Sequence, residues 1–398
     1  MSPGSAAIRP ALPQPLRRLQ PPAGPVVAAV GDGDPALAER LLQDLAPARP
    51  ALVLLFASDA GRLGPVSRQL RAGLPEGCRI VGCSSAGEIG PGGYAADTVT
   101  AIGFPARSFR ADVCVLRQQE QIPVSRWMAR LRRFHAGFAP DARRSVFGVL
   151  LADGHARQED VLVATLDAAV PGVPVVGGSA ADGLRFGRTC QVLDGRRQGG
   201  AALFILIETD FALAEVLFAH FSPTGECAVV TAADPQNRTI LELNAEPAAQ
   251  EYARLAGLDL ARMTPADFAR HPLLLRMGRR HHVRAIRGVT SDGGLELMSV
   301  IEAGTILRLG RAEGLTQGFA DTVAGLPRPP VMILGFDCVL RRLALERAGK
   351  LDRMSAIFRD HRVAGFNTYG EQHSGMHVNQ TFVGMALMPP GASPRGAR

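Results

Sequence analysis

A short glycine-rich pattern, G-x-x-x-x-G-E, occurs at 82–88 and again at 365–371. A related segment at 177–183 keeps the first glycine and the small residues, but its second glycine and its acid are displaced. Glycines let backbone N–H groups approach a ligand closely, and a loop at a strand end opens into a crevice. The pattern therefore predicts ligand-binding loops; purely structural turns, with Glu88 and Glu371 as structural caps, are the alternative. The candidate ligand-binding residues are Gly82, Cys83, Ser84, Gly87, Glu88, Gly177, Gly178, Asp182, Gly365, Asn367, Tyr369, Gly370 and Glu371.

The same segments also allow an enzymatic interpretation. Cys83 or Ser84 could serve as a nucleophile, with His155 as base and Asp153 as the orienting acid. The chain has no G-x-S-x-G elbow, and the third segment carries Phe366 where the first carries Cys83. We therefore predict no catalytic residue and no enzyme activity, with a thiol-based redox sensor as a further alternative.

Composition excludes several other classes. The six cysteines form no C-x-x-C pair, which indicates reduced thiols and neither a metal cluster nor a disulfide framework. The formal charge of +7 comes from scattered arginines, Lys350 being the only lysine, so no nucleic-acid partner is predicted. The turn at 31–35 lacks a lysine and carries two acids, so no nucleotide site is expected. No apolar run is long enough for a membrane span.

The elements that position the loops repeat along the chain. Each loop follows an aliphatic strand, an amphipathic helix and a short strand, and precedes another strand. The predicted fold is therefore α/β, of mixed α+β type, with repeated β-α-β-Gly-loop-β units in mixed sheets. One sheet is expected to carry all six strands of residues 25–225. The expected first strands are 52–56, 146–151 and 331–336; the helices are 62–73, 158–169 and 340–360; the strands after the loops are 98–104, 201–207 and 381–387.

Residues 226–320 do not follow this repeated order of strands, helices and loops. The sequence predicts two strands around a turn at 234–237, a helix at 247–256, and further strands at 283–306 divided by a turn at 291–294. This pattern indicates a strand-rich insertion. With 398 residues the chain is long enough for two domains.

Taken together, these motifs resemble the FIST sensory proteins. The segments that carry the resemblance are 81–88, 153–154, 176–183, 239–244, 366–372 and 377–382, and the likeness extends over about 25–388. The resemblance implies a bacterial, cytoplasmic signal-transduction sensor that binds a small ligand. It also implies a FIST N-terminal domain at 25–237 and a FIST C-terminal domain at 238–388. Residues 1–24, rich in Pro and Arg and without acids, are predicted to form a disordered tail, with a second tail at 389–398.

The run 369–382 most resembles the nitric-oxide-sensing subgroup of that family. This resemblance implies haem b as cofactor and control of a separate partner, either a histidine kinase or a cyclic-di-nucleotide signalling protein. His377 is the candidate axial ligand of the haem iron, with His373 and His220 as the next candidates. A sensor of another small molecule without haem, such as an amino acid, is the alternative. Homo-oligomerisation is left open.

Overall fold

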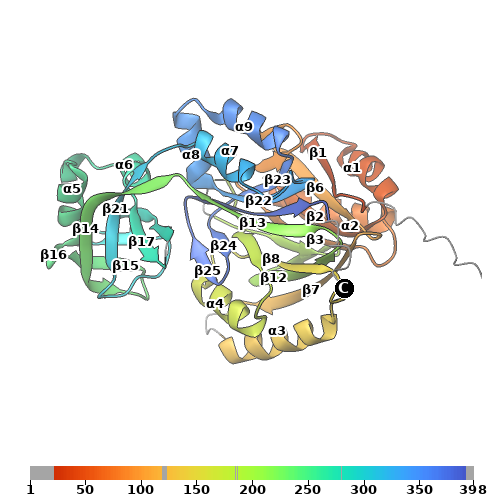
Figure 1. The fold of residues 1–398 in the computed structure, drawn as a ribbon, viewed down its shortest axis with the longest axis horizontal. Helices are drawn as coiled ribbons and strands as arrows, with labels where there is room; N and C mark the ends of the chain where they lie inside the picture. The colour runs from red at the N-terminus through yellow and green to blue at the C-terminus, as the bar shows by residue number, and fades with distance from the viewer. Residues whose placement is uncertain (1–21, 119–122, 184, 186, 279, 391–398) are drawn as a thin grey trace, which may run out of the picture.

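Three mixed six-stranded sheets form the body of the protein (Figure 1). The computed structural model describes residues 22–118, 123–183, 185, 187–278 and 280–390. Most of the two predicted tails, 1–24 and 389–398, therefore lies outside the described residues. The mixed α+β class predicted from the sequence is confirmed.

Each sheet is built on one of the three predicted repeats. The first strand of each repeat pairs in parallel with the strand before the glycine loop and antiparallel with the strand after it. The first repeat is β2 (Pro50–Ala57), α2 (Ala60–Gly73), β3 (Arg79–Ser84) and β6 (Thr98–Pro105). The second is β8 (Ser145–Ala152), α4 (Glu159–Ala169), β9 (Val175–Ser179) and β12 (Ala201–Thr209). The third is β22 (Met332–Cys338), α8 (Val339–Arg347), α9 (Leu351–Asp360), β23 (Val363–Thr368) and β26 (Thr381–Met388).

The predicted helix at 340–360 is thus helical but divided in two. Gly349, with a φ of 62°, lies in the break between α8 and α9. This left-handed backbone conformation ends a helix and suits glycine.

The repeats exchange hairpins in a cyclic order. The hairpin that follows each glycine loop leaves its own sheet and pairs with the strand before the loop of another repeat. Hairpin β4–β5 (Glu88–Gly90, Gly93–Ala95) joins the third sheet, β10–β11 (Gln191–Leu193, Arg196–Gln198) joins the first, and β24–β25 (Glu371–His373, Met376–Val378) joins the second.

At the edge opposite its exchanged hairpin, each sheet ends in one further strand. The edge strands are β1 (Val26–Gly31) on the first sheet, β7 (Phe109–Arg117) on the second and β13 (Ala212–Ala219) on the third. The expectation that 25–225 forms a single sheet is wrong, because the six predicted strands divide between the first and second sheets, and β4, β5 and β13 join the third. The hairpin after each glycine loop pairs with the sheet of another repeat, so the three sheets are joined into one body.

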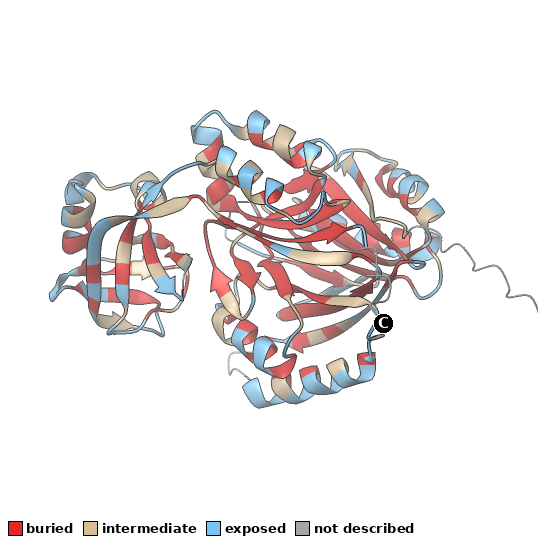
Figure 2. Cartoon of the chain, viewed as in Figure 1, coloured by how far each residue is buried: buried red, intermediate tan, exposed pale blue. Residues whose placement is uncertain are grey.

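The main hydrophobic core lies between the inner faces of the three sheets, which appear as buried strands in Figure 2. Side chains of a strand alternate between its two faces, so every second residue of each first strand contributes to this core. These residues are Leu52, Leu54 and Phe56 of β2, Phe147, Val149 and Leu151 of β8, and Met332, Leu334 and Phe336 of β22.

Helices cover the outer faces of the sheets, and their exposed sides face solvent (Figure 2). Besides the helices of the repeats, they are α1 (Leu37–Leu45), α3 (Val124–Phe138) and α7 (Gln317–Ala324). No helix among the described residues is long and apolar enough to cross a membrane.

Residues 221–312 form a separate lobe beside this body, at the left of Figure 1. The lobe has its own core around Tyr252 and Ile240. Its elements are β14 (Phe221–Asp234), β15 (Thr239–Leu243), β16 (Glu246–Pro247), α5 (Ala248–Ala256), α6 (Pro265–Arg270), β17 (Leu273–Met277), β18 (Arg280–Arg284), β19 (Ile286–Val289), β20 (Leu295–Leu297) and β21 (Ile306–Ala312). The predicted turn at 234–237, the helix at 247–256 and strands within 283–306 are confirmed, whereas α6 and β17 were not predicted.

Candidate functional site

The first glycine of each loop has a structural role. A Cβ atom on Gly82 or Gly177 would lie 2.1 Å from a carbonyl oxygen of the adjacent parallel strand, and one on Gly365 would lie 1.7 Å from the equivalent oxygen. Real Cβ contacts are never this close, so only glycine allows the two strands to approach. The backbone of these three residues serves sheet packing.

The acid of the third loop is enclosed by hydroxyl groups. The Glu371 side chain is fully buried, and its carboxylate accepts hydrogen bonds from Thr368 Oγ1 and from Thr381, whose backbone N lies 3.2 Å and whose Oγ1 lies 2.7 Å away. Burial raises the pKa of Glu371 to about 8, although the threonine hydrogen bonds act in the opposite direction. This arrangement matches a structural cap that ties the loop to the strand after it.

The acid of the first loop has the same surroundings. Glu88 accepts hydrogen bonds from Ser85, from Thr98 Oγ1 at 2.6 Å and from Ser58 Oγ at 2.9 Å. Burial raises its pKa, and the same hydrogen bonds oppose that rise. In the middle repeat the equivalent pairing position is occupied by Gln191, and not by the displaced acid Asp182 that the sequence pattern suggested.

In the third repeat, side chains fill the space beyond the C-terminal end of β22. The buried Asp337 carboxylate accepts a hydrogen bond from Tyr94 and another from Asn367 Nδ2 at 3.3 Å. The guanidinium of Arg342 donates to Asn367 Oδ1 at 3.2 Å, and a Cβ on Gly87 would lie 1.7 Å from its Nη1. Asn367 and Gly87 therefore hold this packing.

The middle repeat leaves a cavity of about 260 Å³ at the equivalent end. Three parts of the chain line it: the connection between β8 and α4, the lobe, and the third loop with its hairpin. The lining residues are Gly154, His155, Arg157, Glu159, Arg238, Arg287, Leu297, Met298, Tyr369 and His377. We call this space the central cavity.

His377 is held in the wall of the central cavity by the third glycine loop. A Cβ on Gly370 would lie 2.3 Å from His377 Cε1 and 2.8 Å from Nε2, so only glycine leaves room for the ring. Among the described residues, His377 Nδ1 and Asn379 Nδ2 are buried without a hydrogen-bond partner. Buried polar atoms without a partner are costly, and such atoms often mark a ligand site.

Tyr369 is fixed by Asp182 beneath the cavity wall. The Tyr369 hydroxyl donates to Asp182 Oδ1, while Asp182 Oδ2 accepts from the backbone N–H groups of Gly187 at 2.8 Å and Arg188 at 2.7 Å. Burial raises the pKa of Asp182, but these hydrogen bonds outweigh it and the net pKa is lowered. His155 meets the Tyr369 ring edge-to-face, with 6.0 Å between ring centroids. Asp182 thus orients a lining residue.

Three arginines line the central cavity, and each is paired with an acid. Arg238 pairs with Glu159, which also lines the cavity, at 3.0 Å, and with Asp160 at 3.4 Å. Arg157 and Arg287 share the Glu296 carboxylate, at 3.1 and 2.9 Å, which lies outside the lining. The wall therefore holds three guanidinium groups, each beside a carboxylate that a ligand carboxylate could replace. Sequence reasoning missed these arginines, because each follows a turn or strand end without any motif.

Two family models match this chain: FIST N domain over residues 51–246 and FIST C domain over 248–374. The chain belongs to the FIST-domain family. FIST domains indicate a sensor of small ligands in signal transduction, as the resemblance implied. A search of curated proteins found no match. The central cavity takes residues from both FIST matches, since Gly154 lies in the first and Arg287 in the second.

Two of the three candidate histidines of this FIST protein, His373 and His377, lie on the same hairpin, whereas His220 lies elsewhere. His373 Nε2 is 2.6 Å from a Glu215 carboxylate oxygen, on the edge of the second sheet. His220 lies where the third sheet leads into the lobe. Of the three, His377 lines the central cavity.

The residues around His377 do not fit haem in this arrangement. A cavity of about 260 Å³ is smaller than the roughly 300–1,000 Å³ typical of pockets for drug-sized ligands, and a haem is at least of that size. The Cε1–Nε2 edge of the imidazole also lies against the Gly370 backbone. The space suits a smaller, polar molecule.

Cys83 lacks the properties of a reactive thiol. Its side chain is fully buried, and burial, followed by Cys190 and Glu88, raises its pKa well above the ordinary value. A thiolate nucleophile needs the opposite shift. The neighbouring Ser84 Oγ accepts a hydrogen bond from the backbone N–H of Cys190 at 3.0 Å.

Gly178, another predicted ligand-binding residue, packs against Thr368, since a Cβ atom on this glycine would lie 2.3 Å from the threonine methyl carbon.

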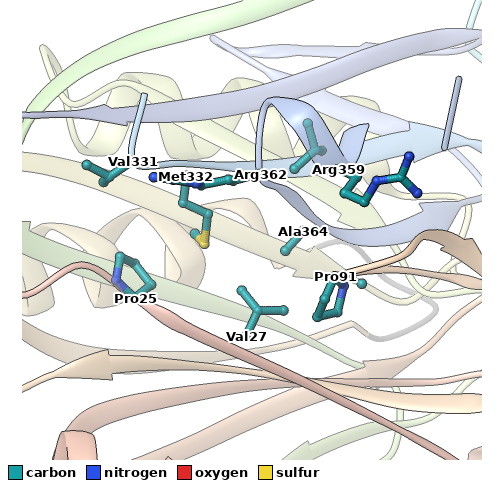
Figure 3. A pocket seen from close by; sticks show the side chains of 10 residues that line it. Pro25, Val27, Pro91, Val331, Met332, Arg359, Arg362 and Ala364 are labelled. Carbon is teal, nitrogen blue, oxygen red and sulfur yellow. The ribbon is translucent and has the colours of Figure 1, made fainter. Parts of the chain in front are cut away.

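A further cavity, of about 220 Å³, lies between the start of β1 and the end of α9 (Figure 3). Its apolar lining includes Pro25, Val27, Pro91 and Met332, and Arg359 lies at its side. None of the residues predicted to bind ligand lines it.

Proposed function

We propose that this protein is a bacterial, cytoplasmic signalling sensor that binds a small anionic or zwitterionic molecule, such as an amino acid, in the central cavity. The observation that carries the proposal is the joint lining of one cavity by the body and the lobe, with three guanidinium groups in that lining. A carboxylate group of the ligand would pair with Arg157 and Arg287, and a ligand ammonium with Glu159. Binding would then join lobe and body.

Ligand screening of the purified full chain tests this proposal. We expect at least one amino acid or small dicarboxylate to raise the melting temperature and to bind saturably in calorimetry. Arg287→Gln should weaken binding about tenfold or more, because hydrogen bonds to charged groups contribute about 1.5–3 kcal/mol. Arg276→Gln, an exposed arginine of the same lobe outside the cavity, is the matched control. Equal affinity in both variants would exclude the central cavity as the binding site.

Output requires a separate protein, because the sequence carries no recognised kinase, receiver, cyclase or DNA-binding motif. We propose a histidine kinase or a cyclic-di-nucleotide enzyme as that partner. Ligand-dependent change in the partner's activity, present with the wild-type sensor and reduced with Arg287→Gln, is the expected result. We propose no catalytic activity of the sensor itself.

Haem-based sensing of nitric oxide is the second candidate function. It is supported by the resemblance of 369–382 and by the unpartnered Nδ1 of His377 beside the cavity. Haem would have to separate the third loop from the lobe, since the present cavity is too small. Hemin titration followed at the Soret band tests this candidate. Loss of the band in His377→Ala, but not in His373→Ala or His220→Ala, would favour it over the amino-acid candidate.

A further inference from the structure

A pocket larger than the central cavity, of about 530 Å³, lies at the hinge between the body and the lobe. Both chain connections between the two parts line it, His220 on the way into the lobe and Ala312 to Leu315 on the way out. Helix α6 of the lobe and the C-terminal end of α8 complete its wall. We call it the hinge pocket. It shares no lining residue with the central cavity.

The wall of the hinge pocket is mostly apolar. Alanines of three elements and one leucine form most of it; they are Ala266, Ala269, Ala312, Ala344, Ala348 and Leu315. A volume of about 530 Å³ falls within the range that holds drug-sized ligands, roughly 300–1,000 Å³. The pocket can therefore accommodate an apolar chain or ring.

Cations surround the pocket. Arg347 and Lys350 are exposed at the end of α8, and no acid partner of either is found among the described residues. Arg270 is paired with Asp267 at 2.9 Å, and the one lining acid, Glu313, accepts a hydrogen bond from Ser222 at 2.9 Å. The Ser222 hydroxyl is neutral and leaves the charge of Glu313 in place, so the two cations Arg347 and Lys350 against this one acid give the pocket a net positive charge, which suits an anionic group.

One buried polar group in the wall also lacks a partner. The His220 residue is 3% exposed, and among the described residues its Nδ1 finds no hydrogen-bond partner. Burial, with a smaller effect from Arg341, lowers the pKa of His220 to about 3, so the ring is neutral near pH 7. A neutral imidazole can donate to or accept from a bound polar group.

From these features we propose that the hinge pocket binds a small monocarboxylate with an apolar tail, its carboxylate at Arg347 and Lys350 and its tail among the alanines. Such a ligand would contact both segments that connect the lobe to the body, and also helix α6 of the lobe and helix α8 of the body. It therefore fixes the lobe relative to the body. This site is independent of the function proposed for the central cavity.

Calorimetric titration of the full chain with octanoate tests this inference, with octanol and octylamine as neutral and cationic probes of equal chain length. We expect octanoate to bind saturably, one molecule per chain, and octylamine not to bind. The double variant Arg347→Gln/Lys350→Gln should weaken octanoate binding about tenfold. Arg353→Gln, an exposed arginine of α9 outside the pocket, should bind as the wild type does.

Ala344→Trp, which fills the pocket, should abolish octanoate binding. Hydrogen exchange at 219–221 and 312–315 should slow when octanoate is added. Failure of butyrate, octanoate and decanoate to bind at millimolar concentration would overturn the inference. Octanoate binding that is unchanged in the double variant, or matched by octylamine, would do the same. The exposed double variant keeps the test valid if Ala344→Trp does not fold.

Discussion

Replacing Glu371 by Gln should stabilise the folded protein above pH 6. The Glu371 carboxyl is fully buried between two threonine hydroxyls, and burial raises its pKa to about 8, from an ordinary value of 4.5. The folded state therefore favours the neutral carboxyl. An amide has the same shape, can donate to one threonine and accept from the other, and carries no charge. The middle repeat already has Gln191 at the equivalent position.

The size of the effect follows from proton linkage. Because the folded-state pKa is raised, the stability contributed by the neutral carboxyl is fully present below pH 4.5 and is lost as the pH rises toward 8. Each pKa unit corresponds to about 1.36 kcal/mol. The free energy of unfolding should therefore fall by roughly 2–3 kcal/mol between about pH 5 and pH 7 from this group alone.

Urea unfolding at several pH values between about 5 and 8 measures this contribution. Glu371→Gln should flatten the decline of stability with pH, whereas Glu76→Gln, at an exposed site, should leave it unchanged. An unchanged decline in Glu371→Gln would refute the buried neutral carboxyl. Destabilisation of Glu371→Gln by more than about 2 kcal/mol at every pH would show instead that the ionised carboxylate is required.

Three further substitutions test the packing around the loops. Gly370→Ala should cost about 1–3 kcal/mol in urea unfolding and weaken ligand binding, because its Cβ overlaps the neighbouring imidazole ring, whereas Gly92→Ala, with open space around it, should change stability by less than about 1 kcal/mol. Arg341→Met should cost about 3–5 kcal/mol in the same measurement, because it leaves a buried carboxylate without its cation. Cys83→Ser should keep ligand affinity in calorimetry; abolition of a measurable hydrolase or transferase activity by this substitution would establish the enzyme alternative.

The repeated units could be predicted from the sequence because their signal is local. Strands, helices and glycine loops leave periodic patterns within about twenty residues, and the aligned segments 82–88 and 365–371 made the repeat visible. The exchange of hairpins left no such signal. Whether the hairpin after Glu88 pairs with its own sheet or with β23 depends on contacts far apart in the chain.

Two residues of the central cavity were among the predicted site residues for the same reason. Tyr369 and His377 line the central cavity and were candidates because they follow a recognisable loop. Arg157, Arg238 and Arg287 come from two distant regions that meet only when the lobe lies against the body. Their positions depend on tertiary structure, and an arginine-rich composition gives them no distinguishing signal.

Comparison of the three repeats explains why the middle one is the best candidate for binding. Tyr94, Arg197 and His377 occupy equivalent positions on the exchanged hairpins. The Tyr94 hydroxyl donates to Asp337, and Arg197 Nη2 donates to a backbone carbonyl at 2.7 Å. His377 Nδ1 has no partner among the described residues, and its ring borders an open cavity. Two copies of this position thus complete internal hydrogen bonds, while the third leaves a buried nitrogen available beside space for a ligand.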